Sequence, residues 1–312
     1  MIKNMKSTML AIAILGWLSL PGCSDENNIG APIEVVLEYV LPQGGASQWA
    51  EGKIQDMYDK YGSYFIYKTT QADFEWSLGM AQVTTSPDSI DLGNPIYVEG
   101  LLKFLDNIWL DHISDDFKKE LGIPYRVLLV DMIWTAGHYS FRESKTVGKA
   151  ITFSGVNADF ANLTTAQKIA KKNAFNSSIW TDYYLNNGIV VFPEEFFTMS
   201  DYTTPVSTVD LNIYNEASAG MQAWRNRGFL PYMYYTNGSA GEWPYMFTNS
   251  PGPMQRDKES YMLHLLQRTD TEMQPFLDNY PLVKQKFEFL INYFNDVYGI
   301  DVRGIANMDF SE

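Results

Sequence analysis

Apolar residues recur at helical spacing in several parts of the chain. Between Ser47 and Gly62 they lie on one face of a helix, with the serine as its N-cap and the glycine as the residue that ends it. A second apolar stripe covers residues 98–109. The strongest helical pattern covers residues 281–298, where a proline opens the helix and Gly299 ends it.

Strand patterns are concentrated in the first half of the chain. Residues 33–41 and 64–70 favour strands, and the continuous apolar run 125–134, which follows a proline, is typical of a buried strand. In the second half, a capping box at Thr164–Gln167 opens a long helix. Residues 212–253, rich in Gly, Pro, Asn and aromatic residues, predict loops. The pattern therefore predicts an α+β fold with a helix-rich second half.

The stretch IVVFPEEFFTMSDY, residues 189–202, sets two adjacent carboxylates in an apolar and aromatic run. Such a pair needs an explanation, because an unpaired buried carboxylate is costly. A helix start provides one: Pro193 would take the first helical position. Glu194 and Glu195 would then lie in the first turn, where carboxylates interact favourably with the helix dipole.

Composition excludes some classes of function. The 312 residues include 46% hydrophobic residues, enough for a sizeable core, and the formal net charge is -14. This charge argues against binding to nucleic acid or to an anionic lipid surface, both of which attract basic side chains. Aromatic residues make up 15% of the chain, and most will lie in the core, although such rings also suit surfaces that stack on sugars or peptides.

The N-terminus has the features of a bacterial lipoprotein signal. A basic start and an apolar stretch, together too short for a spanning helix, lead to the sequence LPGC, which resembles a lipobox. Its cysteine, Cys23, is the only cysteine of the chain, so no disulfide can form within it. We expect a signal peptide at 1–22, a lipidated N-terminus and tether at 23–32, and one domain at 33–312. The alternative is an ordinary cleaved signal with an incidental cysteine.

The residues after Cys23 bear on location. Acyl chains such as palmitate on this cysteine would provide the several anchors that stable membrane attachment needs. Serine rather than aspartate follows it, which resembles lipoproteins sent to the outer membrane, and Asp25–Glu26 resembles the surface-export signal of some gut Gram-negative bacteria. We expect an anchor in the outer membrane. The acidic pair predicts surface exposure or, equally, forms a plain solvated tether.

Residues suited to catalysis are few. The histidines, His112, His138 and His264, lack the spacing that places two imidazoles on one helix face for a metal. His138, with Glu143 nearby, is the one that could act as acid, base or ligand, although a structural role is the simpler interpretation. The sequence contains no G-x-S-x-G motif, no Walker A motif and no dinucleotide-binding glycine pattern.

The order of elements resembles a family of Gram-negative lipoproteins, the substrate-import-associated zinc metallohydrolases, also called zinc-binding metallopeptidases. The resemblance covers most of the mature chain. It is carried by QDMYDKYGSYFIYKTTQADFEW, GIPYRVLLVDM, AWRNRGFLPYMYYTNGSAGEWPYMF and the final helix that ends in YGIDV. It implies a zincin-like scaffold and a gene beside a TonB-dependent, Sus-type nutrient importer.

The same resemblance implies where a zinc site would lie. Family members carry HExxH-type motifs, and the overlay places Glu195 at the general base and Glu194, Thr198 and Asp201 at the ligands, with Glu242 at a further acidic position. Both motif histidines are missing. An oxygen-only set suits zinc poorly, so we expect no intact metal site and no cofactor, with Glu195 as a remnant.

Three hypotheses follow. The leading one is a catalytically degenerate accessory lipoprotein that binds glycan or peptide, with Trp224 and Trp243 as candidate binding residues, beside a TonB-dependent transporter. Its rival is an active zinc metallohydrolase that uses Glu194, Asp201, Glu242 and His138. The third is an unrelated binding or structural lipoprotein.

Overall fold

The protein is described here from a computed structural model, which covers residues 38–78, 88–135, 137–138, 140–204, 212, 215–236, 239–243 and 252–310. For residues 76–78, 234–236 and 239–243 only the backbone is described. The expected signal peptide, Cys23 and the tether lie outside these residues. One compact unit covers Leu41–Glu312, and the following description concerns that unit.

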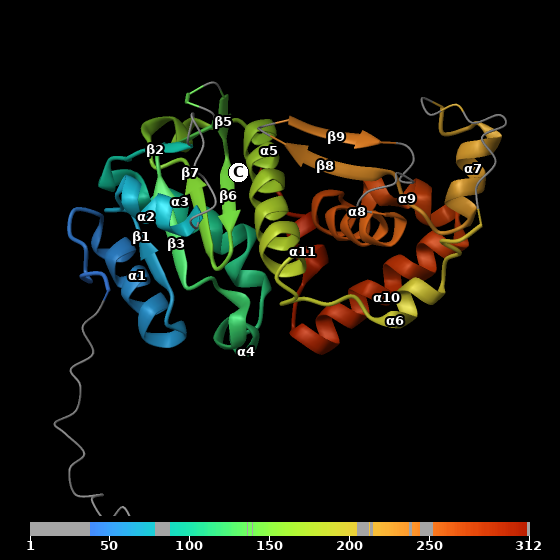
Figure 1. Cartoon of the computed structure of the whole chain (residues 1–312), viewed down its shortest axis with the longest axis horizontal. Coiled ribbons are helices and arrows are strands. Elements are labelled where there is room, and N and C mark those ends of the chain that lie inside the picture. Colours follow the sequence, from blue (N-terminus) through green and yellow to red (C-terminus); the bar gives the residue numbers. More distant parts are fainter. Residues whose placement is uncertain are drawn as a thin grey trace, which may run out of the picture. The chain divides into compact units, whose positions relative to one another are not determined.

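The first half of the unit contains two sheets (Figure 1). The larger has the order β1-β3-β7-β6, in which β1, β3 and β7 are parallel and β6 is antiparallel to β7. The smaller is antiparallel, with the order β2-β4-β5. The strands are β1 (Tyr64–Ile66), β2 (Ser89–Asp91), β3 (Arg126–Val130), β4 (Met132–Thr135), β5 (Ser140–Arg142), β6 (Ser144–Val147) and β7 (Ala150–Ser154).

Helices dominate the second half, together with one hairpin of β8 (Tyr232–Thr236) and β9 (Ser239–Trp243). The helices of the whole unit are α1 (Gln48–Tyr61), α2 (Gln71–Leu78), α3 (Val98–Ile108), α4 (Asp115–Phe117), α5 (Thr165–Asn176), α6 (Glu194–Thr198), α7 (Ala219–Asn226), α8 (Pro253–Gln267), α9 (Asp270–Asn279), α10 (Pro281–Tyr298) and α11 (Val302–Ala306). Two π-helical turns continue α4 and α5: η3 (Lys118–Gly122) and η5 (Ser177–Leu185). Short 3-10 turns are η1 (Pro95–Tyr97), η2 (Leu110–His112) and η4 (Ala158–Asn162).

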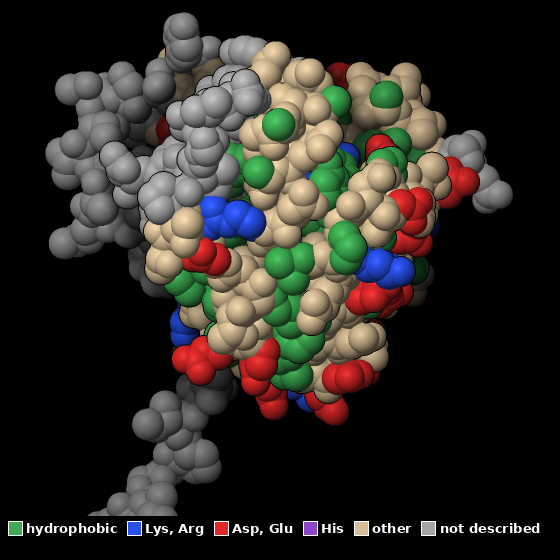
Figure 2. Space-filling view, turned by 90° about the vertical axis from the view of Figure 1, so that its right-hand side faces the viewer, with side chains coloured by type: hydrophobic (Ala, Val, Ile, Leu, Met, Phe, Trp, Pro, Cys, Tyr) green, Lys and Arg blue, Asp and Glu red, His purple; other side chains and the backbone are tan. Residues whose placement is uncertain are grey.

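The described part of the chain is thus mixed α and β, as predicted, with a helix-rich second half. No helix within the described ranges is both long enough and apolar enough to cross a membrane. Figure 2 shows the surface that lies on the right-hand side of Figure 1. On this surface, exposed hydrophobic side chains lie between acidic ones.

Helix ends follow the sequence signals closely. Ser47 accepts a hydrogen bond from the Ala50 amide, and Gly62 ends α1 with a φ of 68°. Thr164 and Gln167 form the expected capping box of α5. Gly299 ends α10 with a φ of 64°. These predictions are confirmed, because each of these ends is fixed by a local hydrogen bond or by a backbone conformation that favours glycine.

Other expectations are wrong in detail. The apolar run 125–134 forms two strands of different sheets, because the chain turns at Asp131 between β3 and β4. Residues 38–41, the described part of the expected first strand, are irregular. The region 212–253, expected to form loops, contains α7 and the β8–β9 hairpin.

α5 and η5 lie between the larger sheet and the C-terminal helices (Figure 1). On the sheet side, Ser144 and Thr146 of β6 donate hydrogen bonds to the Ser178 hydroxyl and carbonyl, at 2.8 and 2.9 Å. On the other side, Gln267 at the end of α8 donates to the Asn173 carbonyl at 3.2 Å. One continuous helical segment therefore connects the two halves.

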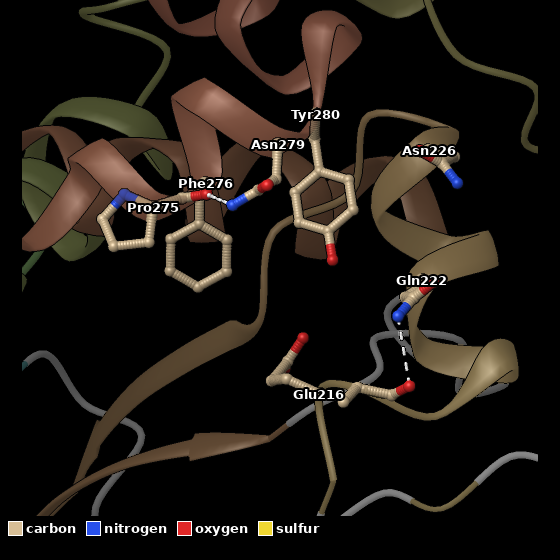
Figure 3. Close-up of a pocket in the computed structure, with 8 residues that line it drawn as sticks. Glu216, Gln222, Asn226, Pro275, Phe276, Asn279 and Tyr280 are labelled. Carbon is tan, nitrogen blue, oxygen red and sulfur yellow. Dashed lines mark hydrogen bonds between the residues drawn. The ribbon is translucent and has the colours of Figure 1, made fainter.

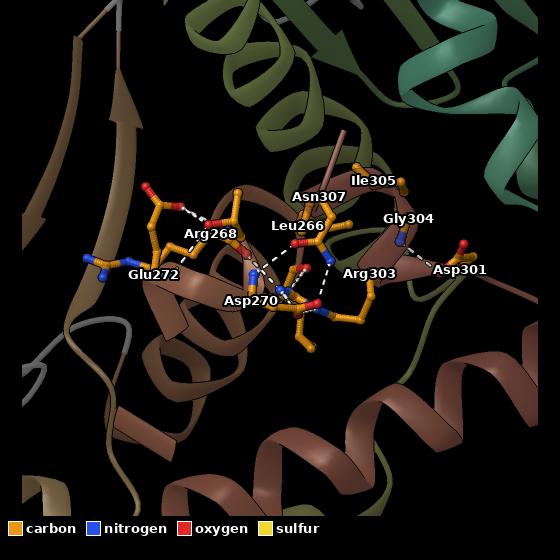
Figure 4. Close-up of polar contacts among 12 residues, drawn as sticks. Leu266, Arg268, Asp270, Glu272, Asp301, Arg303, Gly304, Ile305 and Asn307 are labelled. Carbon is orange, nitrogen blue, oxygen red and sulfur yellow. Dashed lines mark hydrogen bonds and ion pairs between the residues drawn. The ribbon is translucent and has the colours of Figure 1, made fainter. Parts of the chain in front are cut away.

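Hydrogen bonds hold α11, near the C-terminus, against the connection between α8 and α9 (Figure 4). Arg303 of α11 donates to the Leu265 and Arg268 carbonyls, at 2.7 and 2.9 Å, and binds the Asp270 carboxylate. Buried Lys172 of α5 donates to backbone carbonyls at the ends of α8 and α11, and burial lowers its pKa to about 8. These contacts satisfy helix-end carbonyls that would otherwise lack donors.

The most deeply buried charges lie among the C-terminal helices. Lys286 of α10 and Asp257 of α8 form an ion pair at 2.5 Å, and both side chains have no solvent exposure. Lys286 also donates to the Ser200 hydroxyl at 3.0 Å and to the Gly228 carbonyl at 3.2 Å, while the Tyr202 hydroxyl donates to Asp257. All three ammonium protons thus have acceptors.

We expect Lys286→Met to lower the free energy of unfolding by about 3–5 kcal/mol, because it leaves the Asp257 carboxylate buried without its counter-ion. Urea denaturation measures this loss. Lys284→Met is the matched control. This lysine lies on the same helix, but both it and its partner Glu288 are exposed, so the change should cost less than about 1 kcal/mol. Adding Asp257→Asn to Lys286→Met should restore part of the stability. Equal effects of the two lysine substitutions would contradict the assigned role.

Candidate functional site: a pocket between α7 and α9

A cavity of about 590 Å³ lies between α7 and α9. This volume is within the range of about 300–1,000 Å³ that is usual for small-molecule sites. Its lining residues come from three segments, namely the turn before α7, α7 itself and the end of α9 (Figure 3). They are Glu216, Ala217, Gln222, Asn226, Pro275, Phe276, Asn279 and Tyr280.

The α7 side of the pocket is set by a well-capped helix. Ser218 accepts a hydrogen bond from the Met221 amide and begins α7. Gln222 and Asn226 are four residues apart and so lie on one face of the helix, with both side chains exposed. The opposite face is buried through Met221 and Trp224. This division directs the amide groups toward the pocket and the large apolar side chains toward the core.

The α9 side contributes two aromatic rings. α9 begins with a capping box, in which Thr269 and Glu272 exchange hydrogen bonds, and buries Met273. Phe276 and Tyr280 lie at its end, and their rings point into the same space, toward Glu216 (Figure 3). The Asn279 amide group donates to the Pro275 carbonyl at 2.7 Å, and its side-chain oxygen remains available as an acceptor.

The position of Glu216 is fixed by a buried guanidinium group. Arg225 of α7 has no solvent exposure and donates to both carboxylate oxygens, at 3.0 Å from Nε and 2.6 Å from Nη2. Its Nη1 donates to the Phe229 carbonyl at 3.0 Å. The Glu216 side chain keeps 47% of its exposure. A bidentate pair of this kind holds the carboxylate rigidly at the mouth of the pocket.

Two ionisable side chains at or near the pocket, Tyr280 and His264, are in their neutral forms. Burial, reinforced by the Glu216 charge, raises the pKa of the Tyr280 phenol, which therefore stays protonated. His264, which packs against the edge of Phe276, is fully buried, and burial lowers its pKa to about 3. The Nε2 of this neutral imidazole donates to the Pro231 carbonyl at 2.9 Å. It is thus a structural histidine, and its Nδ1 has no partner among the described residues.

The acidic stretch forms a helix start, as its sequence predicts. α6 begins at Glu194, both glutamates are exposed in its first turn, and Pro193 is the N-cap rather than the first helical residue. The aromatic members of the stretch are the buried ones: Phe192 and Phe196 belong to the core. The carboxylates are thus in solvent, so they do not carry the cost of a buried, unpaired charge.

The structure gives the overlaid zinc positions other roles. The Thr198 hydroxyl donates to the Glu195 carbonyl at 2.9 Å. One oxygen of Asp201 accepts from Thr203 and Thr204, and these hydrogen bonds lower the pKa of the Asp201 carboxyl well below its usual range. Among the residues that the structure describes, no three His, Cys, Asp or Glu side chains are grouped so that they could hold a metal ion. These positions therefore do not fit a zinc ion.

The remaining candidates are dispersed. His138 lies in the turn between β4 and β5 and pairs with the Ser89 hydroxyl, whereas Glu143 pairs with Lys171 and Ser154. Glu242 and Trp243 belong to β9, and their side chains lie outside the described residues.

The prediction that Trp224 binds a ligand is wrong, because this side chain is buried. Only 4% of it is exposed, and it packs near Phe229 at a ring distance of 6.1 Å. It is a core residue and offers no open face for a ligand. A tryptophan beside a basic residue carries no local signal of its burial, because burial depends on which face of α7 packs inward.

Sequence reasoning missed the pocket itself. Glu216, Gln222 and Asn226 fall in the region expected to form loops, and Phe276 lies on a helix that the sequence did not predict. It also missed Asp182 of η5, whose pKa is raised to about 6 by burial and by the charge of Glu259. The sequence around Asp182 gives no sign of this pKa shift, because Glu259 is 77 positions away along the chain.

No protein-family model matches the chain, and no curated protein matches it. Among solved structures, it is similar to one described as a "putative zinc-binding metallo-peptidase" from Bacteroides caccae. The two are 12% identical, the match covers 83% of this chain and 90% of that one, and the TM-score is 0.47. A similarity of this size does not by itself establish a shared fold or activity.

The side-chain arrangement at α6 predicts that the purified protein, incubated with zinc and desalted, retains far less than one equivalent. Glu194→Gln and Asp201→Asn should leave that content unchanged, because exposed, oxygen-only groups at different orientations bind zinc weakly. Elemental analysis of the three proteins measures this. Near-stoichiometric zinc that either substitution abolishes would reinstate a metal centre at these residues.

Proposed function

We propose that this chain is a lipid-anchored outer-membrane protein that binds a small glycan or peptide in the α7–α9 pocket. It would serve as an accessory to a TonB-dependent nutrient-import system. The observation that carries the binding role is the pocket, in which two aromatic rings and three amide side chains surround one rigidly held carboxylate. Such a mixture of apolar faces and few, well-placed polar groups is typical of ligand sites.

The membrane location and the import role are supported by the sequence alone. The LPGC sequence, the single cysteine and the acidic residues after it support the anchor. The family resemblance supports the import role and a zincin-like scaffold with a degenerate site. A binding role agrees better than hydrolysis with the surroundings of Glu195, which is an exposed residue in the first turn of a short helix. No metal-bound water is needed for a binding role.

Tyr280→Ala should weaken ligand binding about tenfold or more, because it removes one of the two rings and a neutral phenol donor from the pocket. Isothermal titration of the mature chain with panels of soluble oligosaccharides and short peptides identifies the ligand and measures the loss. Trp49→Ala is the control, since this ring is 41% exposed on α1 and does not line the pocket. The binding role fails if neither panel binds, or if Tyr280→Ala binds as tightly as the unaltered protein.

Cys23→Ser should move the protein from the membrane fraction to the soluble fraction of the producing cell, because the serine cannot form the thioether that carries the lipid. Incorporation of a labelled palmitate analogue should be lost at the same time. Asp25→Asn with Glu26→Gln serves as the control that keeps the anchor. Retention of Cys23→Ser in the membrane fraction would refute lipid anchoring at this residue.

A further inference from the structure

Charge balance around the α7–α9 pocket narrows the class of ligand. Among the described residues that line the pocket, Glu216 alone carries a full charge, and Arg225 neutralises it through two hydrogen bonds. A second guanidinium group, on Arg268, lies 5.4 Å from the centre of the Phe276 ring. The negative charges of Glu272 and Glu216 act on it. In the described part of the chain, the charges at and next to the pocket therefore include two carboxylates and two guanidinium groups, which offset each other.

A ligand with a full charge would gain little in such a pocket. An acidic sugar would meet the Glu216 carboxylate, while Arg225 is buried behind it and already bound. A cationic ligand would gain little charge attraction from Glu216, because Arg225 already neutralises this carboxylate. A short free peptide brings both an ammonium and a carboxylate terminus, and each would lose water without gaining an unengaged partner.

The polar lining groups suit hydroxyl groups instead. Side-chain amides offer both donors and acceptors, and a sugar hydroxyl also both donates and accepts. Gln222 donates to the Ala217 carbonyl at 3.1 Å, so its side-chain oxygen is left to accept, as is that of Asn279. The exposed Asn226 amide adds both functions. The lone pairs of Glu216 that Arg225 does not use provide further acceptors.

The rings provide the apolar contact that such a ligand needs. Phe276 and Tyr280 present their rings side by side to the pocket (Figure 3). The face of an aromatic ring is negative, so it attracts the weakly positive C–H groups that line one face of a pyranose ring. Their position four residues apart at the end of α9 allows each ring to contact the same ligand.

Resting on the proposed binding role of this pocket, we propose that its ligand is an uncharged oligosaccharide, bound by stacking on Phe276 and Tyr280 and by hydrogen bonds to the amides and Glu216. Acidic sugars, amino sugars and free peptides should bind more weakly, because the charges of the described lining already offset each other. This choice between glycan and peptide follows from the lining of the pocket and not from the sequence.

The test compares oligosaccharides of equal length that are neutral, contain uronic acid, or contain free amino groups, together with short peptides, by isothermal titration of the mature chain. The neutral sugars should bind at least tenfold more tightly than the others. Glu216→Gln leaves the Arg225 charge uncompensated and should raise the affinity for the acidic sugars about tenfold or more. Gln222→Glu is the reciprocal variant at an exposed position, and it should favour the amino sugars.

The outcomes separate the two proposals. If a charged ligand binds most tightly and Tyr280→Ala abolishes that binding, the pocket is still the site, and the inference of a neutral ligand is overturned. If a neutral sugar binds and Tyr280→Ala has no effect, the pocket is not the site and both proposals fail. Should Glu216→Gln be too unstable to titrate, an unchanged charge preference in Gln222→Glu would by itself overturn the charge argument.

Discussion

The packing of the C-terminal helices depends on the buried ion pair of Lys286 and Asp257. The lysine ammonium group binds Asp257, Ser200 and the Gly228 carbonyl, and it lies 4.2 Å from the centre of the Phe196 ring and 4.6 Å from that of Tyr261. Burying two charges is unfavourable unless their attraction and further hydrogen bonds compensate for the lost hydration, and here the Oδ1 atom of Asp257 has no hydrogen-bond partner among the described residues. The cost here is offset by acceptors from three separate segments, so the pair forms only when these segments are correctly packed.

This constraint extends to the pocket. Gly228, just after α7, has a φ of 83°, and a Cβ there would lie 2.9 Å from Leu282 and 3.1 Å from Lys286. The absence of a side chain therefore lets the end of α7 approach the start of α10, where the Gly228 carbonyl accepts from Lys286. Tyr280 immediately precedes α10. The lysine thus connects the end of α7 to α10, the helix that directly follows Tyr280.

Much of the fold could be predicted because its signals are local. Caps such as Ser47 and glycines such as Gly299 act within a few residues, and a single sequence shows them directly. Lys286 and Asp257 could not be predicted as buried, because each lies among polar residues, and burial arises from helices that meet only in the folded state. The pocket was missed for the same reason: its two aromatic rings and its carboxylate come from segments about 60 residues apart.

A comparison of the two ion pairs explains why one is structural and the other is suited to binding. Both join a fully buried cation to a carboxylate and to a backbone carbonyl near Gly228. Asp257 is as buried as Lys286, so no ligand can reach it, and its replacement should affect only stability. Glu216 keeps nearly half of its exposure while Arg225 holds it in place. A carboxylate that is both immobilised and accessible accepts hydrogen bonds without first losing conformational freedom, which is the pre-organisation that favours binding. The adjacent acids of the first turn of α6, Glu194 and Glu195, are accessible, but their carboxylates form no hydrogen bond or ion pair with the described residues that would hold them in place.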